Sequence, residues 1–483
     1  MELARNKERM TTALLLILLS CASFPPVWHH WDPYISPKWY ATGMGILILA
    51  CYVLLGLADM SWSILQRSWN KAALLTLAWL LVAVFAQSQN GGVNGSIPFW
   101  PYDNPSGLAL AICLLFIPAV RVLAQRKSWL VLLSVLTFTA VFLTQSRTGL
   151  IVMVLFGGIF LWRIIRWKWM KILEILFIVS TLTLYVATHK QQSSNGRYFI
   201  IKTTMGLIME KPLTGHGWHG FQREYMARQG QYFKEHPDSP YTMLADEVRH
   251  PLNEYLLAWT DWGVVGMLAL MALTLAPFVC CLRHKGIAEA MEQLPLPVFC
   301  CLSYPLFYPL SWVMLAFAYI RMTGKDRKQV KTVFYIASLM LMIYPLRLVM
   351  IEKGMIEDAD ILYNKASKSY RKGQFEKARE YAEQCAESMS GYDLELLSGD
   401  IDRHLGNLKS SVAHYTAAAN QCPCRFAPLE GLFCVYQQCG DSVCAIAVAE
   451  QIVLKPVKVY NAHSTRIKKN ARDYLKEHRQ KNN

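Results

Sequence analysis

Long apolar runs recur along the first 350 residues of this chain, and they limit its fold more than any other feature. Each is close to the roughly 20 residues that a helix needs to cross a bilayer. The runs before residue 190 cover 11–24, 40–58, 72–88, 107–124, 128–145, 148–162 and 171–188. Because lipid offers the backbone no hydrogen-bonding partner, such runs must form helices. Only 17% of the residues are charged, against about 25% in soluble domains, so we predict an all-α, polytopic membrane protein.

Basic residues gather in the short connectors between these runs. Clusters of arginine and lysine lie at 121–127, 163–171, 283–285 and 321–328. Such clusters mark the cytoplasmic side of a membrane protein. We therefore predict a cytoplasmic N-terminus, with the segment 189–251 and the C-terminal tail outside the cytoplasm. This placement accounts for much of the net charge of +15, so we predict no nucleic-acid partner. No small-residue cleavage site follows Phe24, which favours a retained first span over a signal peptide.

The chain after the polar segment predicts four further crossings. One span covers 252–281 and the last covers 332–350. Between them we predict a hairpin that turns near Ser303-Tyr304-Pro305 and has a short first arm at 288–303. The total is about eleven spans, within a range of ten to twelve, and the membrane domain covers 1–350.

The polar segment 189–251 is the first place to look for chemistry, because long polar loops between spans tend to carry function. Arg197 lies near its start, and Arg147 lies in the break between two apolar runs. A guanidinium at a membrane boundary is costly unless it is paired. Two arginines at one membrane face can bind a diphosphate, because the planar fork matches phosphate oxygens. The non-catalytic alternatives are that Arg147 anchors the chain at the membrane interface and that Arg197 is a solvated loop charge.

Histidines of the same segment are candidates for a general base. His250 lies at its end, where a neutral imidazole can take a proton from a sugar hydroxyl. His216 and His219 are rivals, and Gly215 beside them indicates a tight turn or a close approach of backbone. A lone histidine is more often structural. The chain has no phosphate-binding glycine loop, no HExxH and no acidic cluster for a divalent metal, so we predict neither cofactor nor metal.

The tail, 356–483, has a different composition: it is polar, alanine-rich and predicted to be helical. Gly373, Gly406 and Gly440 recur at spacings of 33 and 34 residues. This period resembles tetratricopeptide repeats, in which paired helices stack and leave a concave face for a protein partner. The second repeat has Ser411 where alanine is expected. Six of the thirteen cysteines lie in this tail, and we expect disulfides or plain packing there, with a zinc site as the sharper alternative.

Several short motifs between residues 95 and 320 together resemble the O-antigen ligase and O-antigen polymerase family of membrane glycosyltransferases. They are Asn104-Pro105-Ser106-Gly107, Ser146-Arg147-Thr148-Gly149, Gly196-Arg197, Lys211-Pro212-Leu213-Thr214-Gly215-His216-Gly217, Asn253-Glu254-Tyr255-Leu256, Gly263-Val264-Val265-Gly266 and Ser303-Tyr304-Pro305-Leu306. Each motif alone is weak, but their order and spacing are specific.

The resemblance implies a bacterial inner-membrane enzyme that passes a glycan from undecaprenyl diphosphate to an acceptor hydroxyl at the periplasmic face. The acceptor is lipid A–core, a growing glycan or a protein side chain, and neither metal nor nucleotide is needed. Carried over, Arg147 and Arg197 bind the leaving diphosphate and a loop histidine is the base. The further substrate-binding candidates are Gly215, His216, His219, Asn253 and Tyr255.

One departure concerns the base. The family pattern places a histidine directly before an asparagine, serine or glutamine, with nine residues between that pair and Gly263, at a position where this chain has Leu252. His250 lies two residues upstream and is our candidate. Otherwise the base is another loop histidine, or this branch works without one.

Three alternative functions stay open at this point. A protein O-oligosaccharyltransferase of the same superfamily would use the tail to dock protein acceptors. A transporter of lipid-linked sugars should place its charges near the bilayer midplane. A membrane scaffold that recruits partners needs neither the arginines nor the histidine.

Overall fold

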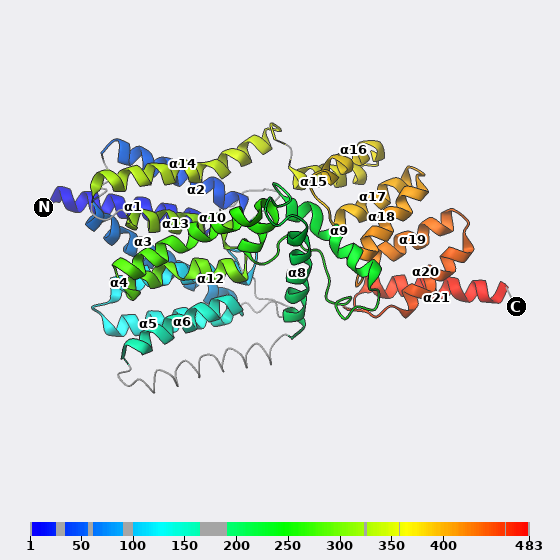
Figure 1. Cartoon of the computed structure of the whole chain (residues 1–483), viewed down its shortest axis with the longest axis horizontal. Coiled ribbons are helices and arrows are strands. Elements are labelled where there is room, and N and C mark those ends of the chain that lie inside the picture. The colour runs from blue at the N-terminus through cyan, green and yellow to red at the C-terminus, as the bar shows by residue number, and fades with distance from the viewer. Residues whose placement is uncertain are drawn as a thin grey trace. The chain divides into compact units, whose positions relative to one another are not determined.

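The computed structural model describes residues 2–25, 34–56, 61–89, 100–164, 191–322, 326–356, 358–458 and 460–481 (Figure 1). These residues form helices, two short 3-10 turns and connecting loops, with no strand among them. The prediction of an all-α, polytopic fold is confirmed. The chain divides into two compact units, and the long helix α10 contributes residues to both.

The first unit comprises Met1–Tyr185, Leu252–Tyr255 and Leu268–Ile356. Its elements are α1 (Glu2–Ser23), α2 (Ser36–Leu54), α3 (Trp62–Gln89), α4 (Pro105–Leu123), α5 (Lys127–Leu143), α6 (Arg147–Ile164), most of α10 (Glu254–His284), α11 (Ile287–Ala290), η1 (Met291–Gln293), α12 (Pro295–Leu302), η2 (Pro305–Phe307), α13 (Pro309–Met322) and α14 (Arg327–Glu352). Among the described residues, α2, α3, α4, α10 and α14 are long and apolar enough to cross a membrane. The span predicted at 171–188 lies outside the described residues, and the total of ten to twelve stays a prediction.

Two spans differ in detail from their predicted form. Helix α10 contains a non-helical residue, Gly263, so the span predicted at 252–281 is broken near its start. The predicted hairpin turns where expected, because α12 ends at Leu302 and α13 begins at Pro309. Its first arm is divided into α11, η1 and α12. Pro295 at the start of α12 ends the preceding turn, since proline cannot donate a backbone hydrogen bond.

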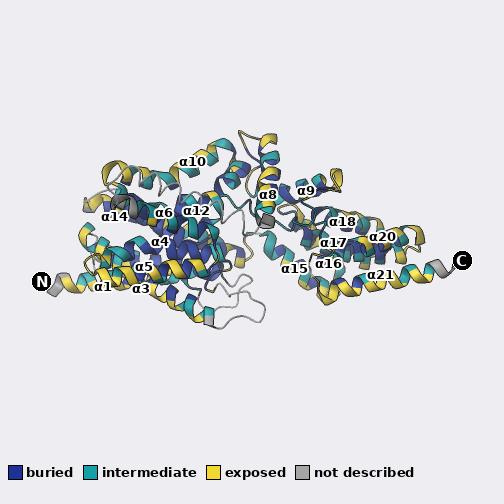
Figure 2. Ribbon diagram, turned by 90° about the horizontal axis from the view of Figure 1, so that it is seen from below, coloured by how far each residue is buried: buried dark blue, intermediate teal, exposed yellow. Residues whose placement is uncertain are grey.

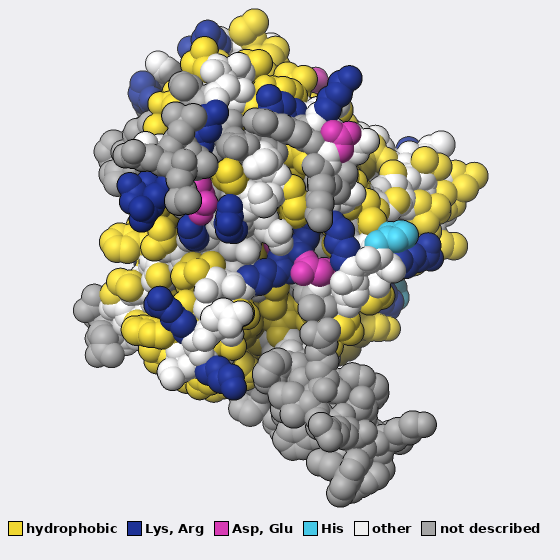
Figure 3. Space-filling view, turned by 90° about the vertical axis from the view of Figure 1, so that its left-hand side faces the viewer, with side chains coloured by type: hydrophobic (Ala, Val, Ile, Leu, Met, Phe, Trp, Pro, Cys, Tyr) yellow, Lys and Arg dark blue, Asp and Glu magenta, His cyan; other side chains and the backbone are white. Residues whose placement is uncertain are grey.

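At one end of this unit, arginines in the last turns of α4 and α13 form ion pairs with two glutamates. Arg121 Nη2 lies 3.0 Å from Glu289 Oε2, and Arg121 and Arg321 both pair with the buried Glu292. These pairs explain why two acids are tolerated in the short hairpin arm. The N-terminus lies at the same end (Figure 1), and Figure 3 shows a face there with more lysine and arginine than acidic side chains. The basic connectors that are described therefore share one end of the bundle, as a positive-inside arrangement requires.

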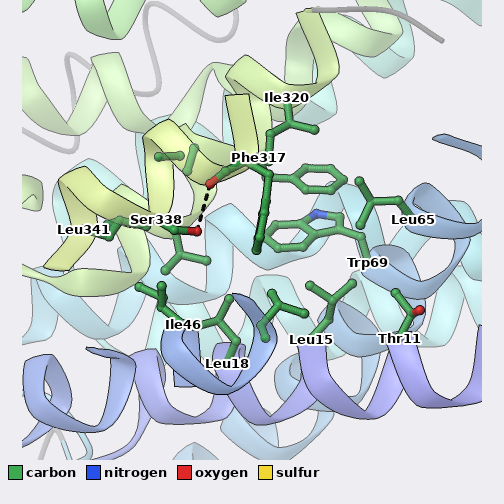
Figure 4. A pocket seen from close by; sticks show the side chains of 15 residues that line it. Thr11, Leu15, Leu18, Ile46, Leu65, Trp69, Phe317, Ile320, Ser338 and Leu341 are labelled. Carbon is green, nitrogen blue, oxygen red and sulfur yellow. Dashed lines mark hydrogen bonds between the residues drawn. The ribbon is translucent and has the colours of Figure 1, made fainter. Parts of the chain in front are cut away.

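The interior of this unit is closely packed. The Trp69 ring stacks on Phe317 with centroids 3.8 Å apart and planes 4° from parallel. A cavity of about 40 Å³ beside them is lined by apolar side chains of α1, α2, α3, α13 and α14 (Figure 4). This volume exceeds the share of one water molecule only slightly. The cavity is a packing defect, far too small for a lipid chain.

The second unit comprises Val186–Pro251, Leu256–Met267 and Glu357–Asn483. It contains α8 (Gln191–Glu210), α9 (Gly220–Glu235), α15 (Ala359–Arg371), α16 (Phe375–Ala386), α17 (Tyr392–His404), α18 (Leu408–Gln421), α19 (Ala427–Gln438), α20 (Ser442–Leu454) and α21 (Ala462–Lys481). The described part of the polar segment thus packs with the tail. A shared apolar cluster includes Phe221 and Tyr225 of α9 with Tyr392 and Ala418 of the tail. Figure 2 shows the buried faces of the tail helices turned toward one another.

The tail forms three helix pairs followed by α21. Gly373, Gly406 and Gly440 lie in the turns of these pairs with φ of 73°, 80° and 70°, a region that favours glycine. The buried Ser411, which departs from the repeat pattern, donates a 2.8 Å hydrogen bond to the carbonyl of Gly399. All thirteen cysteines are free thiols, and Cys385, Cys422 and Cys424 are among the buried ones in the tail. Packing therefore describes these three, whereas Cys434 and Cys444 are half-buried and Cys439 is exposed.

Candidate active site

The turn Pro212–Gly217 crosses the broken helix α10 backbone to backbone. Gly263, at the break, has φ 69° and ψ −171°, a combination that essentially only glycine adopts. An added Cβ there would overlap the carbonyl of Leu213. At Gly215 an added Cβ would lie 2.5 Å from the main-chain oxygen of Asp261. Neither position can hold a side chain, so the two glycine motifs of the sequence meet at a single junction.

Three main-chain hydrogen bonds hold this junction. They run from His216 N to Thr260 O (2.8 Å), from Gly217 N to Asp261 O (2.8 Å) and from Val264 N to Pro212 O (3.0 Å). Backbone paired in this way has one register, because a shift by one residue would leave buried polar groups without partners. The junction thereby fixes α9, which follows the turn directly, against the first turns of α10.

Asp261 is the one acidic side chain at the junction, and the sequence analysis did not single it out. Its side chain is buried, and Oδ1 accepts a 2.9 Å hydrogen bond from Phe221 N in the first turn of α9. His219, His250 and Arg223 all lie close enough to interact electrostatically with the carboxylate. A buried carboxylate is costly unless it is hydrogen-bonded or paired. The available signal was a lone aspartate in the apolar run Ala258-Trp259-Thr260-Asp261-Trp262.

The three candidate histidines have different surroundings. His216 is buried, and its Nε2 lies 2.9 Å from the carbonyl oxygen of Leu207. His219 caps α9 with φ 57°, and its Nδ1 lies 2.8 Å from Gln222 Oε1. His250 is half-buried at the end of the loop. Since a hydrogen bond at one ring nitrogen selects the tautomer, the ring of His216 is fixed within the fold.

The motif Asn253-Glu254-Tyr255 is held by the first unit. Asn253 donates from Nδ2 to Cys301 O and accepts from Tyr255 N through Oδ1, both at 2.9 Å. Tyr255 is buried, and its hydroxyl lies 2.9 Å from Thr274 Oγ1. Glu254 Oε1 accepts a 2.9 Å hydrogen bond from Leu306 N. These side chains connect the start of α10 to the segment before α13.

Two further motifs come together in the first unit. Asn104 Nδ2 donates to the hydroxyls of Tyr304 (2.7 Å) and Tyr308 (2.6 Å). Ser106 Oγ donates to Ser303 Oγ at 2.9 Å. Both motifs belong to the family resemblance, but the sequence predicted no contact between them. A buried lysine nearby was missed: Lys38 Nζ lies 3.4 Å from the centroid of the Tyr102 ring, a cation–π distance.

Each arginine candidate belongs to a different unit. Arg147 begins α6 in the first unit, where Gly149 packs so closely on α4 that an added Cβ would lie 2.7 Å from Ala109 Cβ. Arg197 lies in the second turn of α8, in the same unit as His250. Both side chains are half-buried.

Residues with left-handed backbone lie in the segments that contain the candidate site residues. Among the described residues other than glycine, three have positive φ: Gln145 (54°), His219 (57°) and Leu252 (56°). Such conformations cost roughly 1–3 kcal/mol and collect at functional sites. Each of the three lies within two residues of a candidate site residue, or is one.

Residues 132–271 match the family model described as O-Antigen ligase. This segment belongs to the O-antigen ligase family. No curated protein matches the chain. The resemblance inferred from the motifs between residues 95 and 320 is thus confirmed by a match that contains Arg147, Arg197, His250 and Gly263.

The O-antigen ligase family is one of glycosyltransferases, and its members work on lipid-linked glycans in a membrane. Together with the apolar helices, the match indicates a multi-pass membrane protein and supports O-antigen ligase-type glycosyltransferase activity in general. In the described part of the chain, no group of three or more histidine, cysteine, aspartate or glutamate residues has a metal-binding arrangement.

Proposed function

We propose that the protein transfers a glycan from undecaprenyl diphosphate to an acceptor hydroxyl at the periplasmic face of the inner membrane. The proposal rests on which residues lie within the segment that matches the O-antigen ligase model. This segment holds Arg147, Arg197 and His250, and its backbone crossing sets a buried carboxylate, Asp261, within electrostatic range of the histidine. Cationic groups for a diphosphate and a general base are the groups needed to transfer a glycan from a lipid diphosphate.

The arginines would bind the diphosphate of the donor. Undecaprenyl diphosphate is already a good leaving group, so the enzyme must chiefly neutralise its growing charge and align the reactants. The guanidinium groups of Arg147 and Arg197 suit this task, because each offers paired donors to phosphate oxygens and stays protonated. The glycosidic bond to the diphosphate breaks as the acceptor oxygen attacks the anomeric carbon.

His250 would accept the proton of the acceptor hydroxyl. In a single inverting displacement, the hydroxyl becomes more acidic as its oxygen forms the new bond, and a neutral imidazole takes the proton. Asp261, which interacts electrostatically with His250, would stabilise the imidazolium that results. We assign His216 a structural role, since its ring is bonded to the Leu207 carbonyl.

The orientation follows from the basic end of the helix bundle. If that end faces the cytoplasm, the positive-inside rule puts the segment 189–251, with Arg197 and His250, outside the cytoplasm. Donor and acceptor would then meet outside the cytoplasm.

Complementation of a knockout in the native host tests the proposal. Arg147→Ala, Arg197→Ala and His250→Ala should each abolish one glycan band while the protein is still inserted. Lys234→Ala and His284→Ala are controls, because both side chains are exposed and have no assigned role. Gels of lipopolysaccharide, capsule and glycoproteins name the acceptor, and a lost glycoprotein band would favour the protein O-oligosaccharyltransferase. Full complementation by all three variants contradicts the proposal.

A further inference from the structure

The five residues before His250, which we call the strap (245–249), lie against the C-terminal tail. The strap has no helix or strand of its own. A segment of this kind takes its position from tertiary contacts. All five strap residues make such contacts, and most of the partners belong to the tail.

The first anchor joins Asp246 to Arg425, in the turn between α18 and α19. Arg425 donates from Nε at 2.8 Å and from Nη2 at 2.7 Å to Asp246 Oδ1. The guanidinium also lies over the Tyr392 ring, 4.7 Å from its centroid. Next to it, Cys424 Sγ donates to the carbonyl of Ala245 at 3.1 Å. Two neighbouring residues of the tail thus hold two neighbouring residues of the strap.

A buried glutamine connects α9, the strap and the tail. Gln229 of α9 is fully buried, and its Nε2 donates to Asp246 O at 3.0 Å and to Gln421 O at 2.7 Å. These two hydrogen bonds, donated by one buried amide, link the three segments to one another.

The second anchor is a pair of carboxyl groups. Glu247 forms a hydrogen bond with Asp393 in the first turn of α17, and Arg249 Nε lies 3.5 Å from Glu247 Oε1. Burial and the neighbouring Asp393 raise the pKa of Glu247 to about 7. An added Cβ at Gly391 would lie 3.0 Å from the same Oε1, so the carboxyl group fits closely against the start of α17.

The third anchor joins Arg249, the residue directly before His250, to α15. Arg249 Nη1 donates to Asp360 Oδ1 at 2.9 Å. Exposed ion pairs of this kind contribute little to the free energy of unfolding. Their significance here is positional: three tail segments hold three residues of the five-residue strap, and His250 follows the strap directly.

We propose that the C-terminal tail positions the histidine of the active site, with Arg425, Asp393 and Asp360 as positioning residues. The proposal rests on the proposed function, in which His250 is the base. None of the three residues touches substrate. They act through the strap, and the tail is a part of the transferase rather than an appendage. A displacement of about 1 Å at a reacting group can cost on the order of 100-fold in rate, so a loosened strap should be visible in kcat.

Charge exchange across two anchors tests the proposal. The single variants are Arg249→Asp, Asp360→Arg, Asp246→Arg and Arg425→Asp, and the double variants are Arg249→Asp with Asp360→Arg and Asp246→Arg with Arg425→Asp. Membranes of the knockout strain supply both the unused lipid-linked donor and the unmodified acceptor. Purified full-length protein is added, and initial rates at limiting and saturating membrane separate kcat from KM.

We expect each single exchange to lower kcat by about tenfold or more, with KM changed less than threefold, because the base is displaced while donor contacts persist. Each double exchange should recover most of the lost kcat. Arg466→Asp is the matched control, since Arg466 forms an exposed ion pair with Glu430 between α21 and α19 and should leave kcat unchanged. Hydrogen exchange of the strap, measured on the same samples, shows whether a variant is folded and whether the strap has loosened.

Single exchanges that keep wild-type kcat in folded protein overturn the proposal, as do double exchanges no more active than the singles. If the wild-type protein transfers glycan and His250→Ala is inactive, such results leave the proposed function standing. If the wild-type protein transfers no glycan, the proposed function fails and the positioning role fails with it. A variant that does not fold is replaced by Asp393→Ala, which removes the hydrogen-bonding partner of Glu247 in the second anchor without reversing a charge.

Discussion

Gly263→Ala should open the junction between the 212–217 turn and helix α10. Alanine at φ 69° and ψ −171° costs roughly 1–3 kcal/mol in backbone strain. Its Cβ would overlap the Leu213 carbonyl, and backbone cannot move aside as a flexible side chain would. Relief of the overlap breaks some or all of the three main-chain hydrogen bonds, each worth about 0.5–1.5 kcal/mol. We expect local destabilisation of about 3 kcal/mol or more.

Hydrogen exchange measured by mass spectrometry is the assay, with the His216 and Val264 amides as reporters. A loss of 3 kcal/mol corresponds to about 100-fold faster exchange. Gly217→Ala is the control that has backbone strain without steric overlap, because Gly217 has φ 88° but nothing lies within 4 Å of an added Cβ. It should speed exchange by only about tenfold. Gly196→Ala, with neither strain nor overlap, should leave the reporters unchanged. Protection within twofold of wild type in Gly263→Ala would refute this reasoning.

Three further predictions concern charge, pH and packing. Asp261→Asn should lower kcat about tenfold or more with little change in KM, because a neutral amide does not stabilise an imidazolium; a folded variant with unchanged kcat contradicts this role. The raised pKa of Glu247 stabilises the fold below about pH 4.5, and this contribution is lost as pH rises through about 7. Glu247→Gln should therefore show a smaller fall in Tm between those pH values than wild type, and an equal fall would exclude Glu247 as the cause. Gly431→Ala should lower the free energy of thermal unfolding by about 1–3 kcal/mol, because an added Cβ would overlap the Tyr415 ring. Gly440→Ala has open space for its Cβ, so it should lower this free energy only through the strain of a positive φ.

Local patterns in the sequence predicted much of this architecture. Apolar runs of span length gave the helices of the first unit, and glycines at a spacing of 33 and 34 residues gave the turns of the tail. The glycines around Gly215 predicted a tight turn or a close approach of backbone, and Gly215 does lie against the Asp261 main chain; nothing in the sequence paired it with Gly263. Such features depend on a few neighbouring residues, which a sequence displays directly.

Features that depend on distant partners could not be predicted in this way. Asp261 looked like a lone acid in an apolar run until α9 was found to donate to it. His216 looked as reactive as His250, because nothing in the sequence shows that its Nε2 is hydrogen-bonded to the carbonyl of Leu207. The strap and its tail partners are 111 to 179 residues apart, and no periodicity connects them.

The anchoring of the strap also has a consequence for biosynthesis. Ribosomes add about 5–20 residues per second, and Arg425 is made 179 residues after Asp246. A growing chain therefore carries Arg147, Arg197 and His250 for roughly 10–40 s before the last partner of the strap exists. During that interval the membrane helices can insert while the base is not yet held. A product truncated after α14 would contain every proposed catalytic residue but no tail to position the base, so we expect incomplete chains to consume the lipid-linked donor slowly.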